Sequence, residues 1–120
     1  MSYDLRLGVK VEGLDVIAVI DMPEKHSPTY NLAKVFRQST GWNFEQGTWY
    51  RVSDVLPYIK QGISELIVNH AKYKKLEPDN GWGTISSARE TLISLLDCIE
   101  HQYSDYTWQN IPPEHLWVCW

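Results

Sequence analysis

The side chains that could do chemistry in this chain are aromatic and hydrogen-bonding groups, not metal ligands or a nucleophile with its base. The four histidines, His26, His70, His101 and His115, fall in separate predicted elements. The sequence has no HExxH motif and no Cys/His pair at metal-ligand spacing. It also has no GxSxG, GxxxxGK[ST] or GxGxxG motif. We therefore predict a protein that is not an enzyme, with no catalytic residues, no metal and no cofactor.

The strongest candidate for a site is HSPTYNLAKVFRQSTGW, residues 26–42, where a polar cluster runs directly into a helical pattern. Thr29 can cap that helix by accepting a bond from a first-turn N–H, and capping alone would explain its presence. Asn31 and Arg37 belong neither to the cap nor to the apolar stripe of the helix. This segment can therefore be a helix cap, a ligand site or both, because Thr29 can cap the helix while other residues bind a ligand.

A ligand pocket is predicted from six residues: Thr29, Tyr30, Asn31, Arg37, Asn80 and Trp82. Tyr30 and Trp82 would supply flat apolar walls, and the Asn31 amide can both donate and accept hydrogen bonds. Arg37 would pair with a phosphate or carboxylate. Such a set suits a small polar aromatic ligand, most specifically a nucleotide-like molecule.

The loop EPDNGWGT, residues 77–84, has a structural alternative. In it Asn80, Gly81 and Gly83 would adopt positive φ while Trp82 anchors the loop to the core.

The elements that must position this pocket are strands at both ends of the chain. YDLRLGVKV, residues 3–11, alternates apolar with polar side chains, as a half-buried strand does. VIAVIDM, residues 16–22, is apolar on both faces and predicts a more central strand paired antiparallel with the first. LWVCW, residues 116–120, predicts a final strand, and WNFEQGTWY, residues 42–50, is interpreted as a loop or short irregular hairpin.

Three helices are predicted between these strands: residues 30–40 ending at Gly41, a helix from Asp54 capped by Ser53, and Ile85–Tyr103 capped by Thr84. An extra helical turn is possible at Lys72–Lys75. The fold class is predicted as α+β, in which a small antiparallel sheet of N-terminal hairpin plus C-terminal strand packs against the three helices. Residues 1–120 are expected to form one such domain.

The composition of the chain indicates which kinds of partner it can bind. A net charge of -4 disfavours nucleic acid, because phosphate binding needs a surplus of Lys and Arg. Six Trp and seven Tyr in 120 residues exceed what a core needs, which predicts that some rings face a ligand or partner. Cys98 and Cys119 are far apart in the sequence, which suggests that both thiols are reduced. No stretch of the sequence is long and apolar enough to span a membrane. Trp120 must be packed or covered by another chain, which makes a homo-oligomer plausible.

The SYDL opening, the PTYNL…FR segment, the GI..L end of the middle helix and the NGWG loop resemble a family of small hypothetical proteins of tailed bacteriophages and prophages. The resemblance covers most of the chain. In that family the segment matching Thr29, Tyr30 and Asn31 recurs, which raises its weight as a site. The resemblance implies phage origin and a role in the cytoplasm of the infected bacterial host.

Two functions follow as expectations. The first is a non-enzymatic counter-defence protein that binds and sequesters a small nucleotide-derived immune signal. The alternative is a phage inhibitor that binds a host defence protein directly, or another phage accessory protein.

Overall fold

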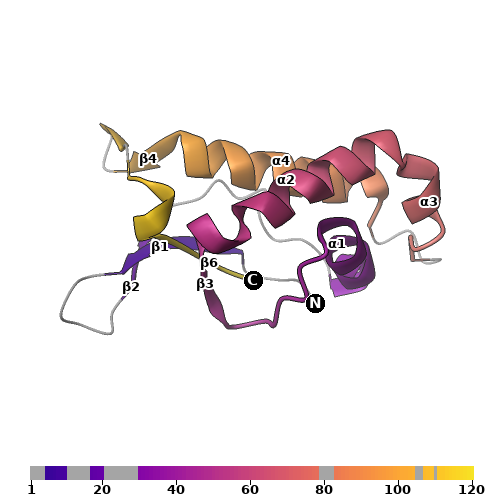
Figure 1. Cartoon of the computed structure of the whole chain (residues 1–120), viewed down its shortest axis with the longest axis horizontal. Coiled ribbons are helices and arrows are strands. Elements are labelled where there is room, and N and C mark those ends of the chain that lie inside the picture. The colour runs from indigo at the N-terminus through magenta and orange to yellow at the C-terminus, as the bar shows by residue number, and fades with distance from the viewer. Residues whose placement is uncertain (1–4, 11–16, 21–29, 79–82, 105–106, 110) are drawn as a thin grey trace.

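The computed structural model describes residues 5–10, 17–20, 30–78, 83–104, 107–109 and 111–120. The predicted α+β class is confirmed (Figure 1). In chain order the elements are β1 (Arg6–Lys10), β2 (Ile17–Ile20), the 3-10 turn η1 (Tyr30–Leu32), α1 (Ala33–Thr40), β3 (Trp49–Arg51), α2 (Val52–Val68), α3 (His70–Lys74), α4 (Ile85–Glu100), β4 (Gln102–Ser104), β5 (Thr107–Gln109), the 3-10 turn η2 (Pro113–His115) and β6 (Leu116–Cys119).

The main sheet has the strand order β2-β1-β6-β3, and each neighbouring pair is antiparallel. The N-terminal hairpin and the C-terminal strand pair as the sequence predicts. The interpretation of residues 42–50 as only a loop or hairpin is wrong in part, because residues 49–51 form β3 on the edge of the same sheet. A three-residue strand is too short to show a two-residue period, and its partner β6 lies at the other end of the chain.

Helices α2 and α4 lie on one side of the sheet, and α1 lies beside the end of the sheet, against α2 (Figure 1). Helix α2 packs against both α1 and α4. Buried side chains from these helices meet Leu7, Leu116 and Val118 of the sheet in one core. At Gly62 of α2 the helices approach so closely that a Cβ atom would lie 2.6 Å from Cγ2 of Thr40 and 2.8 Å from Cδ1 of Leu92. No helix in the described part of the chain is long and apolar enough to cross a membrane.

Two predicted helix boundaries need correction. Helix α2 begins at Val52, not Asp54, and its N-cap is Arg51, because β3 continues directly into the helix. Helix α4 ends at Glu100 instead of Tyr103. Residues 102–104 instead pair with residues 107–109 as a two-stranded sheet, and this pairing overrides the helical periodicity. The extra helical turn near Lys72 is present as α3.

The predicted helix ends at Gly41 and Thr84 are confirmed. Gly41 has φ 73°, and its N–H donates to the Arg37 carbonyl at 3.0 Å. The Thr84 hydroxyl accepts from the Ser87 N–H at 3.0 Å, and the Ser87 hydroxyl accepts from the Thr84 N–H at 3.0 Å. Gly83 has the expected positive φ, at 126°. The N-cap of α1 is Leu32, because the turn η1 precedes the helix, and the predicted cap Thr29 lies outside the described residues.

Trp120 resolves the two possibilities left by the sequence. Its side chain is 1% exposed and packs inside its own chain. It contacts the rings of Phe36, Trp42 and Phe44. The terminal ring therefore gives no reason to expect an oligomer, and the oligomeric state remains a prediction.

Candidate functional site

The six predicted pocket residues are described unequally. Thr29, Asn80 and Trp82 lie outside the described residues. Tyr30 begins η1 and is described through its backbone alone. This leaves the side chains of Asn31, exposed on η1, and Arg37, half-buried on α1.

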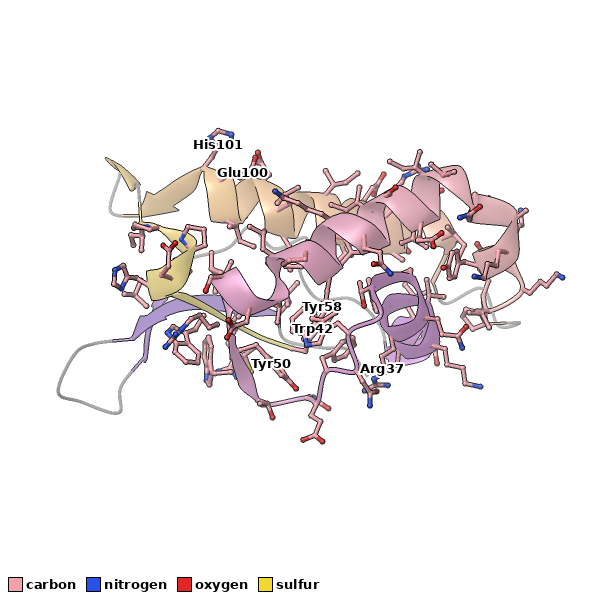
Figure 2. The ribbon with its side chains drawn as sticks, in the orientation of Figure 1. Arg37, Trp42, Tyr50, Tyr58, Glu100 and His101 are labelled. Atoms are coloured by element: carbon pink, nitrogen blue, oxygen red, sulfur yellow. The ribbon has the colours of Figure 1, made fainter. Side chains whose placement is uncertain are left out.

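Arg37 is fixed against the chain that connects α1 to β3. Its Nε and Nη2 groups donate to the Phe44 carbonyl oxygen at 3.3 and 3.2 Å. The guanidinium carbon lies 4.6 Å from the centre of the Phe44 ring. Figure 2 shows the Arg37 side chain projecting from α1 toward this connection. The guanidinium is therefore held by a carbonyl and a ring and remains partly exposed to solvent.

The C-terminal turn of α1 creates this arrangement. The Thr40 hydroxyl donates to the Phe36 carbonyl and accepts from the Trp42 N–H at 3.0 Å. With Gly41 in the left-handed region, the chain reverses away from the helix axis. Trp42 and Phe44 then point into the core, while the intervening Asn43 is exposed.

Behind Arg37 lies a cluster of five rings, which we call the aromatic cluster: Phe36, Trp42, Phe44, Tyr50 and Trp120. Trp42 meets Tyr50 edge to face, with centroids 5.1 Å apart at 89°. The Tyr50 hydroxyl accepts from the Glu45 N–H at 2.8 Å, which fixes the connection that carries Phe44. Trp42, Tyr50 and Arg37 thus come from three successive segments (Figure 2).

The aromatic cluster contains a buried indole donor, that of Trp42, which is unsatisfied among the described residues. The Nε1–H of Trp42 is buried and has no hydrogen-bond partner within the described part of the chain. A buried donor without an acceptor costs about 1–3 kcal/mol. An acceptor that reached this indole would recover part of that cost.

The Arg37 guanidinium is a donor whose chemistry suits an anion or a carbonyl group. The Arg37 guanidinium and the Trp42 indole are N–H donors, the Tyr50 hydroxyl and the Phe44 carbonyl accept hydrogen bonds, and most of the rings behind Arg37 are buried. Among the described residues, no group of three or more His, Cys, Asp or Glu side chains is arranged to hold a metal ion. His101 is exposed just beyond α4.

Sequence reasoning selected Arg37 but missed the residues that hold it. Trp42 and Phe44 alternate on either side of Asn43 directly after Gly41, and this spacing was the available signal. A helix end that reverses at a glycine brings the next residues back beside its own last turn. The partner of Arg37 was therefore close in sequence.

Comparison of the chain with protein-family models, with curated proteins and with solved structures gives no match in any of the three. The candidate site consequently rests on its own geometry.

Proposed function

We propose that this protein is a non-enzymatic binding protein that sequesters a small anionic ligand of the nucleotide class. The observation that carries the proposal is the fixed, partly exposed guanidinium of Arg37. Its Nε and Nη2 hydrogen bonds use one edge of the guanidinium. Within the described part of the chain, Nη1 has no hydrogen-bond partner and is available to an anion.

Pre-organisation is the physical reason that Arg37 suits this role. A free arginine loses rotamer entropy when it binds, whereas a guanidinium already held by a carbonyl and a ring has lost most of it. A phosphate would accept from Nη1 in a charge-assisted hydrogen bond. The Phe44 ring behind the guanidinium excludes water from one side of that contact.

Arg37 alone is insufficient for sequestration. A nanomolar Kd corresponds to about -12 kcal/mol, whereas one charge-assisted hydrogen bond contributes about 1.5–3 kcal/mol. We propose that Tyr30, Asn31, Asn80 and Trp82 supply the remaining stacking and hydrogen bonds, with Thr29 beside them. The proposed setting is phage counter-defence in the bacterial cytoplasm, supported by the resemblance of PTYNL…FR and NGWG to small phage proteins.

The test is calorimetry of the purified protein with a panel of cyclic nucleotides and ADP-ribose derivatives. At least one should bind, and Arg37→Lys should weaken binding about tenfold or more, because an ammonium group cannot make both hydrogen bonds to the Phe44 carbonyl and still present a fixed donor to the ligand. Lys34→Ala is the matched control, since Lys34 is exposed on the same helix. The absence of both heat and a thermal shift with every compound would refute the proposal.

The non-enzymatic part has its own test. The bound compound should be recovered chemically unchanged after the complex is denatured. Appearance of a product would instead indicate an enzyme acting on this ligand.

The alternative function is direct binding to a host defence protein. It is favoured by a second surface, in which arginine and tryptophan side chains share the outer face of the sheet. Failure to recover a stoichiometric partner from host lysate would count against this function.

A further inference from the structure

The face of the sheet opposite the core carries arginine and tryptophan in two rows. In one row Cys119 of β6 lies between Arg6 of β1 and Trp49 of β3. In the next row Trp117 lies between Gly8 and Arg51. We call the surface formed by Arg6, Trp49, Arg51 and Trp117 the Arg–Trp face.

Each arginine of the Arg–Trp face lies over a tryptophan. The guanidinium carbon of Arg6 is 5.2 Å from the centre of the Trp49 ring, and that of Arg51 is 5.2 Å from the centre of the Trp117 ring. Arg6 Nη2 also donates to Sγ of the buried Cys119 at 3.4 Å. These contacts limit the conformations of both arginines before any partner arrives.

The Arg–Trp face remains accessible in the described structure. Arg51 is exposed, and Arg6, Trp49 and Trp117 are each partly exposed. The layer of α2 and α4 covers the opposite side of the sheet (Figure 1). Arg51 forms no ion pair with another described residue, so its positive charge is not neutralised within that part of the chain.

We propose that the Arg–Trp face docks an acidic polypeptide segment whose carboxylates pair with Arg6 and Arg51. Charge complementarity carries the proposal, because the described part of this face is cationic on a chain of net charge -4. Arginine and tryptophan are also the residue types that dominate binding energy at protein interfaces. This surface is separate from the Arg37 region, so the inference does not depend on the proposed small ligand.

The sheet register sets the spacing of the carboxylates. Arg6 and Arg51 are two strands apart and offset by two residues, which places their Cα atoms about 12 Å apart. In an extended peptide, residues i and i+4 are about 13 Å apart and face the same side. An extended segment with acidic residues four apart therefore spans the distance between the Cα atoms of the two arginines.

A single-stranded nucleic acid is less well suited to this surface. Bases bind such sheets by stacking on open aromatic faces, but here each indole already has a guanidinium over it. Two arginines would also neutralise few phosphates, and the remaining charges would be repelled by an acidic chain. The planar forks of the arginines are better matched to carboxylates.

The experiment is an NMR titration of the full chain with a short extended peptide containing two glutamates four residues apart. The indole Nε1–H signals of Trp49 and Trp117 report on the surface and are assigned with Trp49→Phe and Trp117→Phe. We expect these signals to shift on binding and the Kd to rise with salt. Arg51→Gln should raise the Kd about tenfold. Lys60→Gln removes the same charge from an exposed residue of α2 and should leave the Kd unchanged.

Three outcomes would overturn the proposal. One is equal binding of a peptide with glutamine in place of both glutamates. Another is the absence of indole shifts at millimolar peptide. The last is a preference for an oligothymidylate, dependent on Arg51, which would assign the surface to single-stranded nucleic acid. Arg37→Lys should bind the acidic peptide normally, so failure here and failure of the small-ligand proposal are distinguishable.

Discussion

The ring of Phe44 stacks on the indole of Trp120, with centroids 4.1 Å apart and ring planes 10° apart. The last residue of the chain is therefore a core residue, and it also supports the ring on which Arg37 lies. This relationship links the C-terminus of the chain to the candidate site.

Trp120→Ala should destabilise the fold by about 3–5 kcal/mol, because it removes a fully buried indole and leaves a cavity. Urea unfolding followed by circular dichroism measures the loss. Tyr58→Ala is the control, since Tyr58 is 42% exposed and its truncation should cost less than about 1 kcal/mol. Equal unfolding midpoints for the two variants would contradict the packing of Trp120.

Gly62→Ala should also destabilise the protein, although alanine is the better helix former by about 1 kcal/mol. The added methyl group would lie 2.6 Å from Cγ2 of Thr40, and relieving such overpacking costs about 1–3 kcal/mol. Adding Thr40→Ser removes that methyl group but keeps the hydroxyl, and should restore part of the thermal stability. A Gly62→Ala variant more stable than the parent would show that the helices are further apart.

Arg37→Ala should lower the free energy of unfolding by about 1–2 kcal/mol, because two hydrogen bonds to a carbonyl and one cation–π contact are lost at a half-buried position. Hydrogen exchange should quicken at the Glu45 amide, which the same connection holds against Tyr50. Lys34→Ala should change neither quantity. Asn31→Ala, at an exposed side chain, should test ligand binding with less effect on stability.

Burial, with a smaller contribution from the Asp97 charge, raises the pKa of the Cys98 thiol above its ordinary value of 9.0. Well below pH 9 the thiol is protonated in both the folded and the unfolded chain. As the pH rises above 9, the unfolded chain loses this proton first, so the contribution of Cys98 lowers stability. Alkylation of the native protein by iodoacetamide should therefore reach half its maximal rate above pH 9, and Cys98→Ser should abolish it because Cys119 is buried. A midpoint below pH 9 would contradict this.

Local patterns predicted most of the elements correctly. The alternation in residues 3–11 and the helical spacing before Gly41 and after Thr84 each depend on neighbours within a few residues. The errors fell where a distant partner decides the conformation. Residues 49–51 become a strand because β6 is beside them, and residues 102–104 leave the helix to pair with residues 107–109.

The candidate site was predictable only in part. The sequence indicated that Arg37 lies off the apolar stripe of its helix, which its half-buried position bears out. The sequence did not decide whether the Arg37 side chain faces a pocket or solvent. In the structure it donates to the Phe44 carbonyl. The Arg–Trp face could not be predicted from the sequence either, because Arg6, Trp49 and Trp117 come from three separate parts of the chain.

The sequence by itself determined the α+β class, the C-terminal end of α1 at Gly41, the start of α4 after Thr84 and the apolar stripes of the helices, because propensity, capping and periodicity act over a few residues. Only the tertiary structure decided that Trp120 is enclosed by Phe36, Trp42 and Phe44, and that arginines and tryptophans align in rows across β1, β6 and β3. These features depend on strand register and on burial of surfaces from distant segments, which no local pattern specifies.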